Sequence, residues 1–337
     1  MNTWNKTGSV LLDYSAAWET HQIQDGSVIY ENGITYLFYC AGAPDGIGYA
    51  STTTYPTGWS KYASNPLFSK DAGEVNIAAP RVFKMPDGSW RMYYHAYDGT
   101  HDQGRIATAT AQGFPNTWTK IPGVFFTDSA SGFDSVMVQT QAIVPSWLSP
   151  DGKWHVLYGG YNGSQWRGGH AYSDDGLTGW TRDDAHNPVL DLGAGGAWDS
   201  WASLPLSIAK IGSIYYLIYQ GIDASYATDP WPAHKWKLGY ATSTDLVTWT
   251  KYSGNPILSP TTGTAWDSES TEGAFIYFNP QKGILDLHYV GCNVDPWTGY
   301  YKWGMARGVL SVFGNMTSGS GGNASTGPNG NISMGGL

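Results

Sequence analysis

The sequence is poor in charged residues, in cysteine and in long apolar runs. Only 13% of its residues are charged and the formal net charge is -9, so it lacks the basic surface that nucleic-acid phosphates require. No apolar run approaches the roughly 18 residues that a membrane-spanning helix needs. We therefore expect neither nucleic-acid binding nor membrane insertion.

Cysteine is limited to Cys40 and Cys292, which cannot form a disulfide framework. The two lie at similar positions in the first and last repeat units described below, so a single bridge is the alternative to two ordinary buried thiols, which we favour. No group of histidines and cysteines has the spacing of a zinc site, and no glycine-rich loop could cradle a phosphate. We predict no cofactor and no metal site, although a structural calcium ion would leave no readable signal.

Glycine and aromatic residues are abundant instead. The chain holds 44 Gly, 17 Trp and 23 Tyr, and 15% of its residues are aromatic. This composition suits short strands, tight turns and aromatic contact surfaces rather than helices.

One phrase recurs along the chain. It reads W-S-K-Y-A-S-N-P-L-F from Trp59, and related copies begin at Trp118, Trp180 and Trp249, with a partial copy at Trp4. The copies are 55 to 69 residues apart, slightly more than the usual length of a propeller blade. The repeat therefore predicts blades with elaborated loops.

Each repeat unit contains the same succession of short strands. In the first unit we expect strands over residues 27–31, 34–40 and 47–51, with an Asn32-Gly33 hairpin turn and an outer strand from Trp59. The fifth unit stops after its third strand, and residues 4–12 can supply the fourth. We predict an all-β, five-bladed β-propeller over residues 1–310, closed by the N-terminal strand; the alternative is a β-sandwich.

Residues 311–337 form a tail rich in Gly, Ser and Asn, with few apolar side chains to bury. We interpret it as a flexible end or as an attachment to a larger assembly. The first ten residues have no apolar segment typical of a signal peptide. Localisation stays open between the cytoplasm, the cell exterior and a virion.

Carboxylates mark the starts of two first strands. Aligned on the strand that follows, the five units place one residue each at an equivalent position near the channel mouth: Asp25, Ala78, Thr140, Ser203 and Glu272. Only two of them are acidic, and their blades are neighbours in the ring. Glycosidic bond hydrolysis needs such a pair, one protonated and one ionised, so we predict that Asp25 and Glu272 are catalytic; otherwise they are two solvated channel acids.

A second acidic series recurs in every unit, before the first strand: Glu19, Glu74, Asp134, Asp199 and Asp267. Because all five units carry it, we expect a structural role for most members. Glu74 and Asp134 are additional catalytic candidates, since an extra carboxylate could tune the pKa of a partner.

Aromatic and polar side chains fill the loops between second and third strands. Aromatic rings stack on sugar faces, and Arg and Gln side chains bind hydroxyl groups, so the loops predict a carbohydrate cleft. The substrate-binding candidates are His95, Gln139, Trp166, Arg167, Ser203, Trp231 and Trp297.

The chain resembles the five-bladed propeller glycoside hydrolases, which include family 43 arabinanases, xylosidases and arabinofuranosidases and the related invertases and levansucrases. The resemblance covers residues 4–310 and is carried by D-G-S-V-I-Y from Asp25, by E-G-A-F-I-Y from Glu272, and by the W-[ST]-K-Y phrases. It implies Asp25 as general base and Glu272 as general acid, with Ala274 where the family has proline.

The resemblance thus implies a glycoside hydrolase acting on a pentose- or furanose-containing glycan, with an oligo- or polysaccharide as its partner. The alternative is a non-catalytic carbohydrate-binding propeller that is displayed on a larger assembly, such as a virion, through the C-terminal tail.

Overall fold

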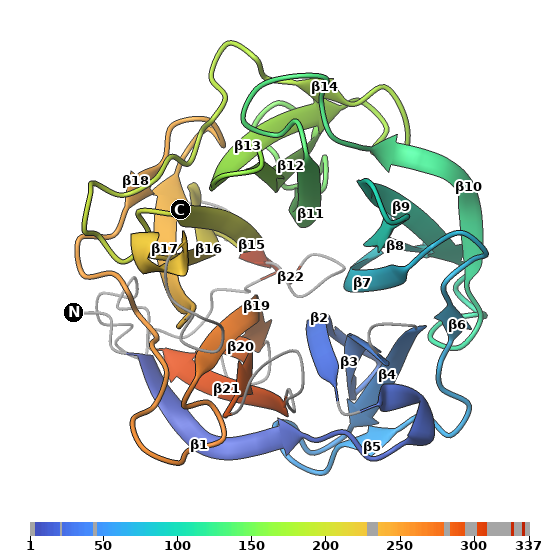
Figure 1. Ribbon diagram of the computed structural model, residues 1–337. Helices are drawn as coiled ribbons and strands as arrows, with labels where there is room; N and C mark the ends of the chain where they lie inside the picture. The colour runs from blue at the N-terminus through green and yellow to red at the C-terminus, as the bar shows by residue number, and fades with distance from the viewer. Residues whose placement is uncertain are drawn as a thin grey trace, which may run out of the picture.

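The strands form a ring of antiparallel sheets around a central axis (Figure 1). The computed structural model describes residues 4–20, 22–42, 46–227, 235–279, 284–293, 302–308, 325–326 and 332–333. Within these ranges the two helices are single 3-10 turns, η1 (Ala17–Glu19) and η2 (Ala224–Ala227). None of the described helices is long and apolar enough to cross a membrane.

The first two blades follow the predicted strand order. Blade 1 contains β2 (Ile23–Glu31), β3 (Ile34–Ala41), β4 (Gly46–Thr52) and β5 (Ser60–Lys61), and β6 (Phe68–Ser69) also pairs with β4. Blade 2 contains β7 (Asn76–Lys84), β8 (Trp90–Tyr97), β9 (Asp102–Ala109) and β10 (Thr119–Phe126).

Blades 3 and 4 repeat the pattern and are joined by one parallel bridge between Trp166 and Ala202. Blade 3 contains β11 (Met137–Val144), β12 (Trp154–Tyr161), β13 (Trp166–Ser173) and β14 (Thr181–Arg182). Blade 4 contains β15 (Ala202–Ile211), β16 (Ile214–Ile222), β17 (Lys237–Ser243) and β18 (Thr250–Lys251).

Blade 5 combines the two ends of the propeller sequence. It contains β19 (Ser270–Asn279), β20 (Ile284–Cys292), β21 (Lys302–Gly308) and, as its outer strand, β1 (Trp4–Leu12). Trp4 pairs with Gly308 and Leu12 with Trp303. The predicted ring closure by the N-terminal strand is therefore confirmed. Most of the predicted tail lies outside the described residues, which include only the short pair β22 (Ser325–Thr326) and β23 (Ile332–Ser333) there.

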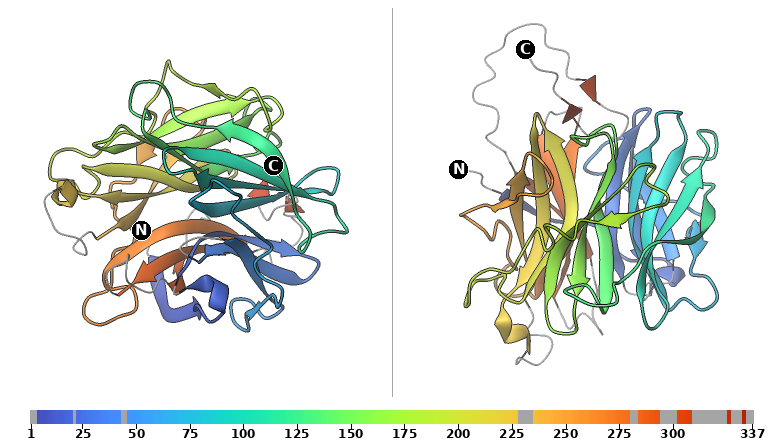
Figure 2. Two further views of the ribbon diagram at one scale, coloured as in Figure 1. Left: turned by 45° about the vertical axis from the view of Figure 1, so that its right-hand side comes forward. Right: turned by 90° about the horizontal axis from the view of Figure 1, so that it is seen from above.

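The core lies between neighbouring blades rather than in a single centre. Figure 2 shows the sheets side by side across the thickness of the disc. The facing strands of blades 1 and 2 pack Phe38, Tyr49, Trp90 and Met92, and similar apolar clusters fill the other blade contacts. Cys40 and Cys292 are both buried in these layers and form no disulfide bond, as favoured from the sequence.

The repeated phrase supplies a network that ties each outer strand to the inner one. In four blades the Lys or Arg of W-x-[KR] pairs with the acid of its own unit, and a tyrosine hydroxyl of the second strand donates to the same carboxylate. The acid, cation and tyrosine sets are Glu19, Lys61 and Tyr39; Asp134, Arg182 and Tyr158; Asp199, Lys251 and Tyr219; Asp267, Lys6 and Tyr289.

Blade 2 departs from this network. Its Lys120 pairs with Asp71, whose side chain is 64% exposed, while Arg105 lies 3.5 Å from the Glu74 carboxylate. The structural role predicted for Glu19, Asp199 and Asp267 is confirmed by these contacts, because all three carboxylates are buried and paired.

Lys6→Met should destabilise the protein by about 3 kcal/mol, because it leaves the Asp267 carboxylate buried, at 2% side-chain exposure, without its cation. The Lys6 ammonium also donates to Ser259 and Thr261, so the closing strand loses its anchor to the last connection. Chemical denaturation of the two proteins measures the difference.

Lys120→Met is the matched control, because it removes the equivalent cation where the partner carboxylate is exposed. It should cost less than about 1 kcal/mol. Equal losses of unfolding free energy in the two variants would show that the Lys6–Asp267 pair contributes no more to stability than the exposed pair in blade 2.

Candidate functional site

A buried arginine closes the middle of the channel. Arg81 of β7 is 1% exposed, and its five N–H groups make five hydrogen bonds. Nε and one Nη reach the backbone oxygen and Oε1 of Gln141, and the others reach the carbonyls of Gly26, Pro80 and Leu206. The guanidinium also lies 5.6 Å from the ring centre of Phe275. It therefore contacts the inner strands of all five blades.

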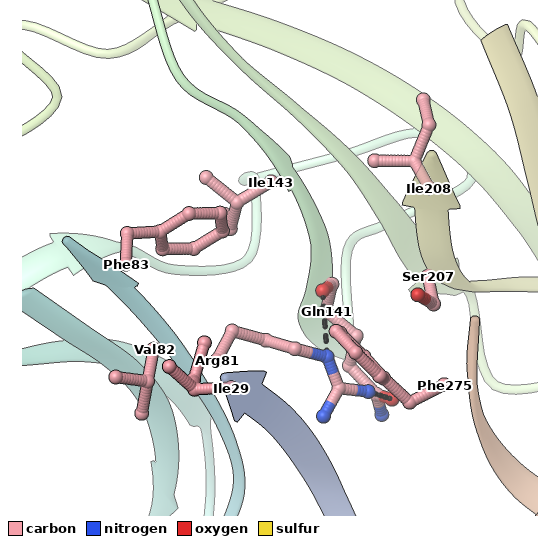
Figure 3. A pocket seen from close by; sticks show the side chains of 9 residues that line it. All are labelled: Ile29, Arg81, Val82, Phe83, Gln141, Ile143, Ser207, Ile208 and Phe275. Carbon is pink, nitrogen blue, oxygen red and sulfur yellow. Dashed lines mark hydrogen bonds between the residues drawn. The ribbon is translucent and has the colours of Figure 1, made fainter. Parts of the chain in front are cut away.

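Arg81 separates the channel into two halves of different character. On the side of the ends of the inner strands, a narrow pocket has walls of Ile29, Val82, Phe83, Ile143 and Ile208 (Figure 3). No carboxylate lines this pocket, and the arginine donors that reach it are already used. Besides these apolar walls, Arg81, Gln141 and Ser207 line the pocket. The two predicted acids, Asp25 and Glu272, lie near the starts of their inner strands.

Asp25 has an unusual backbone conformation. It is the extra residue of a β-bulge between Gln24 and Gly26, and its φ of +30° lies in the left-handed region that L residues rarely adopt. The residue as a whole is partly exposed, and its carboxyl group accepts no hydrogen bond from the described residues. Such strained residues concentrate at functional sites, so Asp25 is a strong candidate.

The surroundings of Asp25 favour its neutral form. Burial deep in the ring raises the pKa of the Asp25 carboxyl, and the positive charge of Arg81 opposes this only in part, without a direct ion pair. The reciprocal effect is visible on the guanidinium, because burial lowers the pKa of Arg81 to about 10 although Asp25 raises it. Asp25 is thus a carboxyl group that retains its proton to higher pH than usual.

The backbone of blade 5 packs directly against Asp25. A Cβ atom placed on Gly273 would lie 2.5 Å from the Asp25 Oδ1 atom, and Gly273 has a φ of +57°, so no other residue fits here without strain. The Gly273 amide donates to the Gln220 side chain at 3.1 Å. The residue before Gly273 is Glu272, so the two predicted acids belong to strands in contact.

Glu272 is half-buried in β19, and its Oε1 accepts a hydrogen bond from the Ser270 hydroxyl at 2.8 Å. The two predicted acids therefore sit in different environments, one without hydrogen bonds and one with a hydroxyl donor.

The predicted equivalence of five strand positions is wrong in register. Glu272 pairs with Val290, and the same position in the other blades holds Gln24, Ala78, Gln139 and Leu204. Asp25 instead occupies the following bulge, as do Ala79 and Gly273, which also have positive φ. The bulges differ in length between blades, so alignment on the downstream strand slips by one residue.

His95 and Gln139, two of the predicted substrate-binding residues, lie close to Arg81. His95 is 6% exposed, its Nδ1 has no partner among the described residues, and burial together with the Arg81 charge lowers its pKa to about 4. Gln139 is half-buried and accepts a hydrogen bond from Gln141, which in turn binds Arg81. A neutral imidazole and an amide thus accompany the two acids.

Other sequence candidates lie in different settings. Trp166 is half-buried and stacks on Tyr161 with ring centres 5.0 Å apart. Arg167 pairs with the exposed Asp191 at 2.7 Å. Ser203 is fully buried and accepts a hydrogen bond from Lys251, which places it in the blade 4 network and away from the mouth. Trp231 and Trp297 lie outside the described residues.

A catalytic role for Glu74 and Asp134 finds no support in the geometry. The Asp134 oxygens are taken up by Ser129, Tyr158 and Arg182. Glu74 accepts from the Asp71 amide and lies beside Arg105, with 5% of its side chain exposed. In the part of the chain that the structure describes, no group of three or more acidic, histidine or cysteine side chains could hold a metal ion.

Arg81 and Gln141 were not identified from the sequence as channel residues. A signal was present, because Arg81 is the one charged residue within the apolar first-strand stretch N-I-A-A-P-R-V-F. An arginine at such a position must be hydrogen-bonded internally, which points to the channel axis.

Neither a family model nor a curated protein sequence matches the chain. Solved structures do match. A thermostable family-43 glycoside hydrolase has 19% identity and a TM-score of 0.63, covering 85% of this chain and 89% of its own. A glycosyl hydrolase from Bacteroides ovatus has 19% identity and a TM-score of 0.67, with 90% and 92% covered.

A third match belongs to work on the GH130 family of mannoside phosphorylases, described as containing glycoside hydrolases that target beta-1,2 mannosidic linkages in Candida mannan. It has 16% identity and a TM-score of 0.66, covering 91% of this chain and 93% of its own. The fold is that of the glycoside hydrolase propellers. At these identities the likeness defines the architecture and leaves the substrate to the residues of the mouth.

Asp25→Asn should raise the melting temperature at neutral pH. Burial raises the pKa of Asp25 above its ordinary 3.8, so the folded protein keeps a proton that the unfolded chain releases above that pH. The free energy of unfolding therefore falls as pH rises from about 4 toward the pKa of Asp25 in the folded protein. Asp25→Asn removes this loss because asparagine does not ionise. Each kcal/mol regained should add about 2 °C, measured by thermal unfolding at several pH values.

At about pH 3 both residues are neutral, so the difference between the two proteins there reflects only the change of side chain. Asp174→Asn, at an 89% exposed side chain, should leave the pH profile unchanged. A pH-independent difference between wild type and Asp25→Asn would contradict the assignment of a retained proton.

Proposed function

We propose that the protein is a glycoside hydrolase that uses Asp25 and Glu272 on a pentose- or furanose-containing glycan. The observation that carries the proposal is the setting of Asp25. Its backbone is strained, its carboxyl has a raised pKa and no hydrogen bond from the described residues, and it packs against the residue that follows Glu272. The glycosidase fold of the structural neighbours supports it.

The environments favour a division of roles opposite to the one that the family resemblance implies. Asp25, whose pKa is raised by burial, is the proton donor to the leaving oxygen. Glu272, which accepts a hydrogen bond from the Ser270 hydroxyl, activates water or attacks the sugar. Gly273 keeps the two residues in neighbouring strands at the start of the channel.

The remaining mouth residues suit a neutral, hydroxyl-rich ligand. Gln139 offers an amide, His95 an imidazole that is uncharged at neutral pH, and Trp166 and Tyr161 an aromatic pair at the rim. Of the five residues at the register position of Glu272, only Glu272 is acidic. Arg81 seals the channel below them, which confines a substrate to this face.

Asp25→Asn and Glu272→Gln should each lower kcat/KM by about 10² to 10⁴, because each removes one half of the acid–base pair. For both variants the measurement is sugar release from arabinan and xylan, whose alcohol leaving group needs a proton. Release of 4-nitrophenol from 4-nitrophenyl α-L-arabinofuranoside and β-D-xylopyranoside is measured in addition for Glu272→Gln, because 4-nitrophenolate leaves without protonation. Thermal unfolding confirms that both variants fold.

Asp174→Asn, far out on the third blade and exposed, serves as the control and should keep full activity. Wild-type activity in either acid variant would refute the proposed pair. Binding of an arabinan or xylan oligosaccharide by calorimetry, with no product after prolonged incubation, would instead identify a non-catalytic carbohydrate-binding propeller.

A further inference from the structure

The blade repeat contains a ladder of three side chains on the face toward the next blade. In blade 1 they are Tyr36 of the second strand, Tyr49 of the third strand and Tyr62 just after the outer strand. Tyr49 and Tyr62 stack with ring centres 5.0 Å apart, and Tyr36 meets Tyr49 edge-on. Blade 4 has the same ladder in Tyr216, Tyr240 and Tyr252.

Blade 3 replaces all three tyrosines with ionisable groups: His155, His170 and Asp183. The backbone positions are unchanged, because Leu157 pairs with His170 as Phe38 pairs with Tyr49 and Ile218 with Tyr240. The Asp183 amide also donates to the His170 carbonyl, as the Tyr62 and Tyr252 amides do to Tyr49 and Tyr240. We call His155, His170 and Asp183 the blade 3 ladder.

The blade 3 ladder is a continuous chain of hydrogen bonds. The Nδ1 of His155 lies 2.9 Å from the Nε2 of His170, and the two rings are nearly parallel at 6°. At one end the Nδ1 of His170 lies 3.1 Å from Asp183 Oδ2, and at the other the Nε2 of His155 lies 2.8 Å from Asp151 Oδ1. Both imidazoles are at most 4% exposed.

The number of protons on the blade 3 ladder determines whether its hydrogen bonds can all form. Its three contacts need three protons, whereas two neutral imidazoles carry two N–H groups between two ionised carboxylates. One added proton completes all three hydrogen bonds. A second added proton places an N–H at both sides of the 2.9 Å contact and two positive charges in one buried pair, which that geometry cannot hold.

We propose that the blade 3 ladder is an acid-operated latch, which stays closed with no added proton or one and opens when both imidazoles become charged. Opening separates His170 from Asp183 and releases the segment 183–190 from β13. This inference is independent of the catalytic proposal, because the ladder lies on the blade 4 side of blade 3 and includes no channel residue.

The charged and titratable neighbours agree with opening in acid. Within blade 3 these are Asp151, Lys153, Tyr172, Asp183 and His186, and from blade 4 Tyr215 and Lys210 approach through their shared acceptor, the Leu148 carbonyl. Burial lowers the pKa of His155, although Asp151 opposes it, and lowers that of His170 to about 4. Because unfolded histidines charge more readily, acid removes stability from the closed ladder.

The pKa of Asp183 itself is shifted in the opposite sense to that of a simply buried carboxyl. Burial favours its neutral form, but hydrogen bonds from His186 and His170 hold the pKa of Asp183 below its ordinary value.

Asn187 adds two hydrogen bonds to the backbone of His170, an arrangement that Asn65 and Asn255 repeat at Tyr49 and Tyr240. The three blades therefore differ at the ladder while sharing the same backbone clamp.

Hydrogen exchange of the wild-type protein, read by mass spectrometry at about pH 7, 5 and 3.5 and corrected for intrinsic rates, tests the latch. Between about pH 5 and 3.5 the protection of residues 183–190 should fall at least about tenfold more than that of residues 252–258, the equivalent segment beside a tyrosine ladder. Equal loss in the two segments, or full protection of 183–190 at the lowest pH, would overturn the proposal.

The variant His155→Tyr/His170→Tyr/Asp183→Tyr restores the ladder of blades 1 and 4. In it the acid-dependent loss of protection in 183–190 should disappear, whereas a loss like that of the wild type would also refute the latch. Because the wild-type comparison is made within one molecule, it decides the question even where the triple variant fails to fold.

Discussion

The Arg81 guanidinium is the interaction on which the ring depends. Five blades that pack only against their neighbours leave an axis where carbonyl groups from several inner strands converge. The planar guanidinium of Arg81 donates five hydrogen bonds to acceptors in β2, β7, β11 and β15. The Phe275 ring of β19 also packs against it. A buried charge is tolerated in proteins only when it is hydrogen-bonded in this way.

The same cation shapes the chemistry of the mouth. Its charge acts on Asp25 and His95 from below, without an ion pair, and its seal keeps the apolar end of the channel apart from the polar end. Asp25 is thereby held between two opposing influences, burial and a nearby positive charge. Burial is the larger influence, so the pKa of Asp25 is raised, and its proposed role as acid follows from that shift.

Repetition separates scaffold from function across the molecule. In four of the five units the recurring acid is bound by a tyrosine and a cation, which accounts for Glu19, Asp134, Asp199 and Asp267 as structural groups. The residues that break the repeat deserve separate explanations. Asp25 and Glu272 break it at the mouth, and His155, His170 and Asp183 break it at the tyrosine ladder, where charge replaces aromatic packing.

The sequence by itself determined the blade count, the strand order and the closure by residues 4–12, because these depend on a local pattern of strands, turns and a repeated phrase. It also identified Asp25 and Glu272 as exceptions to the repeat. It could not give their register, since bulges of different length precede each inner strand and shift the residues that follow. Only the tertiary structure decided that Asp25 packs on Gly273 and that Arg81 joins five blades. It alone also showed that His155 and His170, 15 residues apart, are in hydrogen-bond contact. Those features arise from groups brought together across strands, and no local pattern records how close such groups come or how deeply they are buried.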